Sequence, residues 1–228
     1  MKVNHLKTKN DALKKAEEKL FSVLSKYTNE NIPVLLLLSG GSAIEIIKEF
    51  DWTEIKNVTI TTLDERYAND ESNNFLSLEK YLPRNIETLP TVPKENEDLE
   101  TFANRLNKNL KDWLAKYING KIVATLGIGA DGHTAGILPI DDKNIEKKMN
   151  DQNVFVIGYK TDKSEHKMRA TTNFTFLKKI NNAIVFLSGE KNKKTAWEKI
   201  IAKSGNKNDT PSRIICEMTG EVSVFMDF

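Results

Sequence analysis

Residues 33–50 read PVLLLLSGGSAIEIIKEF. Residues 33–38 form a continuous apolar run of strand length, as expected of a parallel strand that is covered on both faces. Two glycines break this run, and residues 43–50 resume the apolar spacing that is typical of a helix. A strand, a glycine turn and a helix in this order are the phosphate-binding arrangement of α/β proteins. The stretch therefore predicts an α/β fold.

Strands and helices alternate along the rest of the chain. Apolar runs predict strands at 58–63, 122–126, 154–157, 183–188 and 222–226, and helical spacing predicts helices at 10–27, 72–81, 99–117 and 191–202. We find no repeat, linker or boundary between them. The pattern predicts one domain over residues 1–228, a three-layer sandwich with a mostly parallel sheet.

The composition excludes several classes of protein. The chain has 228 residues, 39% of them hydrophobic, and the formal net charge is +2, from 34 Lys and Arg against 32 Asp and Glu. Such a balance does not favour nucleic-acid binding. No apolar run is long enough to span a membrane, and the N-terminus lacks the apolar segment of a signal peptide. The one cysteine, Cys216, excludes an internal disulfide, so we expect a cytoplasmic protein.

A glycine-rich loop presents the best candidate for catalysis. Residues 126–135 read LGIGADGHTA and follow the predicted strand at 122–126. Because ligands of open α/β sheets bind beyond the carboxyl ends of strands, Asp131 and His133 are well placed to act on one. A histidine exchanges protons near neutral pH, and a carboxylate can fix its tautomer. The alternative is that this loop is an ordinary turn and His133 has no catalytic role. The other two histidines, His5 and His166, are in polar surroundings, and we interpret both as surface residues.

Other polar residues could hold an anion. Backbone N–H groups around Gly40 and Gly41 could converge on a phosphate, with hydroxyl donors from Ser39 and Ser42, although the same residues could form a simple capped turn. Asp64, Glu65 and Arg66 form the next group. Arg66 could donate two hydrogen bonds to a phosphate, and the alternative is that the group is a surface cluster of ion pairs. The remaining candidates are Arg169 and the lysines 191, 193 and 194, which could equally form a solvated face.

The order of these motifs resembles the 6-phosphogluconolactonase family. The similar elements are Ser-Gly-Gly-Ser at 39–42, Asp-Glu-Arg at 64–66 followed by Ser-Asn at 72–73, Gly-Ile-Gly-Ala-Asp-Gly-His-Thr-Ala at 127–135, Arg-x-Thr at 169–171 and Pro-Ser at 211–212. They cover nearly the whole chain. The resemblance implies a Rossmann-like fold and hydrolysis of the sugar-phosphate lactone 6-phosphoglucono-1,5-lactone without a metal or cofactor.

The resemblance also implies roles for individual residues. His133 would be the general base that activates water, and Asp131 would position it or a substrate hydroxyl. The expected substrate and phosphate ligands are Ser39, Gly40, Gly41, Ser42, Asp64, Arg66, Arg169 and Lys193. Lys193 is chosen because Asn192 occupies the position where the family usually has its lysine. We expect a small-molecule sugar phosphate as partner, no nucleic acid or membrane, and a monomer or weak dimer.

Two alternatives remain open. A glucosamine-6-phosphate deaminase or isomerase would share the fold, but such enzymes place a glutamate five residues after the histidine, where this chain has Leu138. A non-catalytic sugar-phosphate-binding module would keep the phosphate loop and lose the base, and His133 argues against it. We also expect residues 159–168, which are polar and rich in lysine, to form a mobile lid before Arg169.

Overall fold

The centre of the molecule is a seven-stranded parallel sheet. The computed structural model describes residues 1–189, 191–202 and 204–228, and its main sheet has the strand order β1-β10-β9-β6-β2-β3-β5. These strands are β1 (Lys2–His5), β2 (Val34–Leu38), β3 (Val58–Thr62), β5 (Glu87–Thr88), β6 (Lys121–Gly127), β9 (Asn182–Leu187) and β10 (Glu221–Met226). The mostly parallel sheet is thus confirmed.

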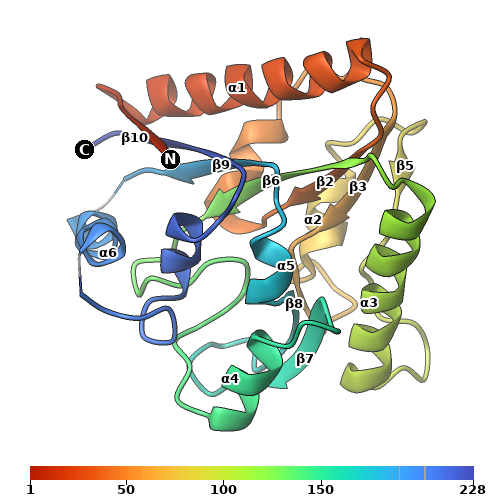
Figure 1. Cartoon of the computed structure of the whole chain (residues 1–228), viewed down its shortest axis with the longest axis vertical. Helices are drawn as coiled ribbons and strands as arrows, with labels where there is room; N and C mark the ends of the chain where they lie inside the picture. Colours follow the sequence, from red (N-terminus) through yellow and green to blue (C-terminus); the bar gives the residue numbers. More distant parts are fainter. Residues whose placement is uncertain (190, 203) are drawn as a thin grey trace.

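Helices cover both faces of the sheet (Figure 1). They are α1 (Lys9–Asn29), η1 (Gly41–Ile47), α2 (Asn74–Glu79), α3 (Leu99–Lys116), α4 (Lys143–Met149), α5 (Phe174–Leu177), α6 (Lys191–Ile201) and η2 (Pro211–Cys216). Side chains of β2 alternate between two apolar cores: Leu36 packs with α1, and Leu35 and Leu37 pack with α3. The structure therefore confirms the predicted Rossmann-like three-layer sandwich.

The strand order places a switch point between β2 and β6. From β2 the chain continues outward to β3 and β5, whereas from β6 it continues to β9 and β10 on the opposite side. The connections that leave these two neighbouring strands diverge, which opens a crevice at their carboxyl ends. The segment beginning at Ser39 and the segment beginning at Ile128 both enter that crevice.

A second sheet was not predicted. Three antiparallel strands, β4 (Asp64–Arg66), β8 (Met168–Thr172) and β7 (Val156–Lys160), pair in this order beside the carboxyl end of the main sheet. The charged residues of β4 and the arginine and threonines of β8 conceal these strands from an apolar pattern. Residues 159–168, predicted as a mobile lid, are partly strand and form a hairpin in which Thr161 N donates to Lys167 O at 2.8 Å.

The helix predicted at 43–50 is also different. Gly41–Ile47 form a short 3₁₀ helix that begins after Gly40, and no side chain caps it, so Ser42 is not a helix cap. Tight helices of this kind occur in short pieces. Because only a few peptide dipoles align here, the helix contributes little to anion binding. Gly41 has a φ of +61°, which glycine adopts without strain.

No helix within the described ranges is long and apolar enough to cross a membrane.

Candidate active site

A cavity of about 540 Å³ lies at the carboxyl ends of β2 and β6, where the second sheet meets them. It contains nearly all of the residues singled out in the sequence. The cavity is lined by Ser39, Gly40, Gly41, Ser42, Asp64, Arg66, Asn74, Gly127, Ile128, Gly129, His133, Ala135, Gly136, Ser164, Glu165, His166, Arg169 and Lys193. Asp131 adjoins it through His133. The side chain of Lys191 lies outside the described part of the chain.

Asp131 and His133 form a dyad. The Asp131 carboxylate oxygen Oδ1 lies 2.6 Å from His133 Nδ1 and accepts a hydrogen bond from the His133 backbone N–H at 3.1 Å. Partial burial opposes the charged carboxylate, but the hydrogen bonds from His133 outweigh it and lower the pKa of Asp131. An Nδ1–H held by a carboxylate leaves Nε2 as the basic nitrogen of the ring. His133 is thus arranged to accept a proton from a molecule in the cavity.

The loop that carries this dyad is fixed by its backbone. Gly129 N donates to His133 O at 2.9 Å, and Ser212 N donates to Gly132 O at 3.0 Å. A Cβ atom on Gly129 would lie 2.2 Å from the His133 ring, so this glycine is required for the ring to lie where it does. The contact from Ser212 connects the loop to η2, which gives a structural role to the Pro-Ser pair at 211–212.

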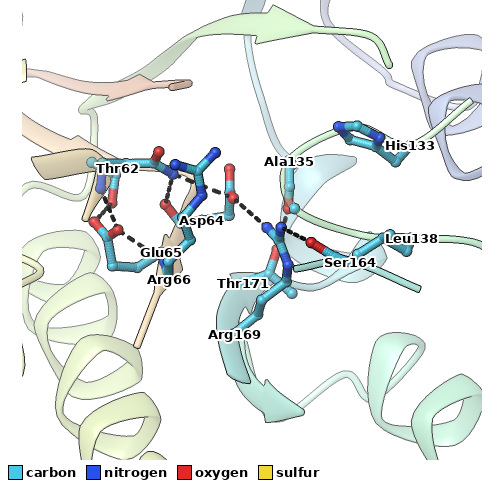
Figure 2. Close-up of polar contacts among 12 residues, drawn as sticks. Thr62, Asp64, Glu65, Arg66, His133, Ala135, Leu138, Ser164, Arg169 and Thr171 are labelled. Carbon is cyan, nitrogen blue, oxygen red and sulfur yellow. Dashed lines mark hydrogen bonds and ion pairs between the residues drawn. The ribbon is translucent and has the colours of Figure 1, made fainter. Parts of the chain in front are cut away.

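Two arginines lie next to each other on adjacent strands of the second sheet. Arg66 on β4 and Arg169 on β8 are direct cross-strand partners, so their side chains lie on the same face. Like charges at such a position destabilise a sheet unless an anion or a carboxylate compensates them. Asp64 supplies part of this compensation, since its Oδ2 lies 3.6 Å from Arg169 Nη1 (Figure 2). The pair is well suited to grip a phosphate.

Three buried polar atoms of the site have no hydrogen-bond partner within the described ranges. They are Ser39 Oγ, Arg66 Nε and Arg169 Nε. Other nitrogens of the two guanidinium groups donate to protein atoms: Arg66 Nη1 donates to Ser72 O at 3.0 Å, and Arg169 Nη2 donates to Ser164 Oγ at 2.9 Å. Buried donors without partners are costly, so their concentration here indicates a site for a ligand that accepts hydrogen bonds.

Asp64 is buried at the junction of these groups. Burial raises the pKa of its carboxyl, against the opposite effects of Arg169, His133 and Arg66. Asn74 Nδ2 donates to Asp64 O at 3.0 Å and lies 3.4 Å from Asp64 Oδ2. A Cβ on Gly136 would lie 2.4 Å from that oxygen. The Asp64 side chain is therefore held in place by the protein, and the surface-cluster interpretation is wrong.

Glu65 points away from the cavity and supports its wall. As the residue between Asp64 and Arg66 it projects to the other face of β4, where it is fully buried. Its carboxylate accepts hydrogen bonds from the backbone N–H groups of Asn74 at 2.5 Å and Phe75 at 3.0 Å. Burial raises its pKa to about 8, and the bond from Asn74 acts in the opposite direction. Glu65 thus joins β4 to the start of α2.

Replacing Glu65 by alanine is expected to lower the free energy of unfolding by about 2–4 kcal/mol, because several buried donors lose their acceptor. Urea denaturation followed by circular dichroism would measure this. Glu18→Ala is the control, since Glu18 is exposed on α1 and pairs with Lys15 at 2.6 Å. Equal unfolding midpoints for the two variants would contradict the assigned role.

Sequence reasoning assigned no individual role to four residues of the cavity, Asn74, Ser164, Glu165 and His166, although the last three lie in the segment 159–168 that it expected to form a lid. Asn74 begins α2 directly after the Ser-Asn pair at 72–73, and no role was predicted for it. The other three lie in the turn of the β7–β8 hairpin, so the interpretation of His166 as a plain surface residue is wrong. A hairpin prediction for residues 156–172 would have directed attention to this turn. Leu138, by contrast, is buried in the apolar core.

Within the described ranges, no cluster of three or more His, Cys, Asp or Glu side chains could hold a metal ion. The groups that the cavity does present include a base, two arginines and hydrogen-bond donors. Together these groups could bind an anionic substrate and remove a proton from water or from the substrate.

Comparison with known proteins identifies the family of the chain. Residues 7–224 match the family model described as glucosamine-6-phosphate isomerases/6-phosphogluconolactonase. The chain belongs to this family. A relative from Dictyostelium discoideum, named probable 6-phosphogluconolactonase, is 29% identical over 221 residues, which are 90% of this chain and 88% of the relative.

Solved structures of the glucosamine-6-phosphate isomerase/6-phosphogluconolactonase family share the fold. A 6-phosphogluconolactonase from Shewanella baltica has a TM-score of 0.83 and 19% identity, over all of this chain and 98% of the other. A 6-phosphogluconolactonase from Trypanosoma brucei has a TM-score of 0.79 and 20% identity, over 99% and 95% of the two chains. Because the identities are this low, the two comparisons show a shared fold alone.

Proposed function

We propose that this protein hydrolyses 6-phospho-D-glucono-1,5-lactone to 6-phospho-D-gluconate in the cytoplasm, with His133 as general base. The observation that carries the proposal is the placement of the Asp131–His133 dyad and the Arg66–Arg169 pair in one cavity. The dyad is suited to deprotonate water, and the arginines are suited to hold a phosphate. The name of the Dictyostelium discoideum relative supports the same substrate.

The proposed reaction needs one proton carrier. A water molecule attacks the lactone carbonyl carbon while its proton passes to His133 Nε2, and Asp131 stabilises the imidazolium that forms. The tetrahedral intermediate then collapses, the bond between the carbonyl carbon and the ring oxygen breaks, and the ring oxygen takes the proton from His133. Because a lactone is an activated ester, a positioned water and a base suffice. Binding of the remote phosphate supplies energy for orientation.

The residue in place of the isomerase glutamate argues against the deaminase alternative. Leu138 is buried, packs in the apolar core and carries no ionisable group. Deamination of glucosamine 6-phosphate requires further proton transfers, which a single dyad serves poorly. Lactone hydrolysis is the reaction that fits the groups present.

A coupled assay with freshly generated 6-phosphogluconolactone tests the proposal directly. The rate should exceed the spontaneous hydrolysis measured without protein, and the lactone without a phosphate should react much more slowly. Glucosamine 6-phosphate, offered in a parallel assay, should not release ammonia. A lactone rate equal to the spontaneous one would overturn the proposal, and release of ammonia would favour the deaminase.

Two glycine variants test whether the position of the His133 ring controls the rate. Gly129→Ala is expected to lower kcat about ten- to a hundredfold, because the new Cβ would displace the ring and misaligned groups lose much of their effect. Gly127→Ala is the matched control, since its Cβ would meet Ala43 at an ordinary 3.7 Å. Steady-state kinetics of both variants provide the measurement. Equal losses in both would refute the positional argument.

A further inference from the structure

The turn of the β7–β8 hairpin forms one wall of the cavity. Ser164, Glu165 and His166 line it, although they are distant in sequence from the loop of His133. Lys163 secures the turn from the other side, since its Nζ donates to Pro139 O at 2.8 Å and lies 2.9 Å from Asp141 Oδ2. The turn is thus joined to the segment that follows the dyad and is placed to contact whatever fills the cavity.

This turn also lies at the arginine end of the cavity. Ser164 Oγ accepts the hydrogen bond from Arg169 Nη2 (Figure 2). His166 acts electrostatically on Asp70, whose carboxylate accepts a hydrogen bond from Ser72 N at 2.8 Å. The carbonyl of Ser72 in turn accepts the bond from Arg66 Nη1. His166 is therefore near the supports of both arginines, on the side of the cavity where a phosphate is expected.

We propose that His166 is a further phosphate-binding residue of this site, which donates a hydrogen bond to the phosphate held between Arg66 and Arg169. The inference rests on the proposed function, because it assumes a phosphorylated substrate. His166 is half-buried and lines the cavity, so a ligand can reach it while water only partly surrounds it. An imidazole can supply one donor when neutral and a positive charge when protonated.

The charges around His166 decide the sign of its contribution. Those of the cavity and its rim are Asp64, Arg66, Asp70, His133, Glu165, Arg169 and Lys193. A phosphate ester with a charge of about −1.5 to −2 would attract a positively charged imidazole. Glu165 opposes the phosphate, but it is exposed and solvent weakens its effect. The contribution of His166 should therefore be favourable and should grow as the imidazole gains its proton.

Calorimetric titration with 6-phosphogluconate measures this contribution. His166→Asn is expected to raise Kd about fivefold at pH 6, the size of one partly screened charge contact, and less at pH 8, where histidine is largely neutral. KM for the lactone should rise in parallel and kcat should stay unchanged. His5→Asn is the matched control, because His5 lies at the edge of the main sheet with Nδ1 2.8 Å from Phe228 O. Glu165→Gln should lower Kd.

Three outcomes would overturn the inference. They are an unchanged Kd at both pH values, an equal increase at pH 6 and pH 8, and a loss of kcat with Kd intact, which would indicate a role in catalysis. The binding measurement does not depend on turnover. The protein could fail to hydrolyse the lactone while His166→Asn still raises the Kd for 6-phosphogluconate in the expected way. In that case the proposed function would be wrong and the phosphate-binding role of His166 would stand.

Discussion

Replacing His133 by asparagine is expected to lower kcat for lactone hydrolysis about a hundred- to ten-thousand-fold, which is the usual contribution of a general base. Asparagine keeps a polar group near Asp131 but has no nitrogen that can accept a proton from water. The Asp131–His133 contact at 2.6 Å and the loop that fixes it are the basis for this size of effect. The coupled assay, corrected for spontaneous hydrolysis, measures it.

Binding separates a chemical role of His133 from a structural one. The Kd for 6-phosphogluconate should stay close to that of the parent protein, because Arg66 and Arg169, which we propose to hold the phosphate, lie on the second sheet and not on the loop of the dyad. Asp131→Asn should also reduce kcat with little change in Kd, since the ring loses the carboxylate that orients it. A variant at residue 133 that retained the parent kcat would exclude this histidine as the base.

Arg169→Met should raise KM and the Kd for 6-phosphogluconate about a hundredfold, because a charge-assisted contact to the phosphate is lost. The same change removes the ion-pair partner of buried Asp64, and breaking such a pair costs about 3 kcal/mol of stability or more. Binding by calorimetry and unfolding by urea are the two measurements. Arg84→Met, a change in the loop after α2 and away from the cavity, should alter neither.

The double variant Arg169→Met/Asp64→Asn distinguishes the two effects. The second substitution removes the unpaired carboxyl, so it should restore part of the stability and none of the phosphate affinity.

The stability lost in the single variant Arg169→Met should depend on pH with a definite sign. Loss of Arg169 raises the folded-state pKa of Asp64 further above its ordinary value of 3.8, so the stability deficit is smallest below that pH and grows as pH rises. A deficit independent of pH would contradict this.

Five of the seven strands of the main sheet and most of the candidate site could be predicted because their signals are local, whereas the edge strands β1 and β5 lack an apolar run and were not predicted. Fully buried parallel strands such as Val34–Leu38 are uninterrupted apolar runs, and the glycine loops follow them directly. Once the strands are assigned, the rule that their carboxyl ends meet at one edge brings Ser39 and His133 together. That Arg169 lies near Ser39 and His133 could be predicted only from the family resemblance. About forty residues without a clear apolar pattern separate β6 from β8.

The second sheet could not be predicted, because its order depends on tertiary contacts. The residues of β4 alternate between a binding face with Asp64 and Arg66 and a buried face with Glu65, and a buried glutamate is unexpected from composition. Its donors come from α2, nine or ten residues later in the chain. The position of His166 at the cavity was not predicted either, because the weak apolar pattern of residues 156–172 did not indicate the β7–β8 hairpin that carries it.

The pairing of β1 with β10 sets a constraint on how the molecule assembles. Residues 2–5 pair with residues 223–226, and Asn4 Nδ2 donates to Val224 O across 220 positions of sequence, so the two ends of the chain lie near each other in Figure 1. On a translating ribosome the first strand therefore waits for the last one, with its backbone groups unpaired. Contacts of such high order form slowly. Until β10 has been synthesised and pairs with β9, the edge of β9 also stays exposed to other chains. A chaperone that shields this edge during synthesis should raise the yield of folded protein.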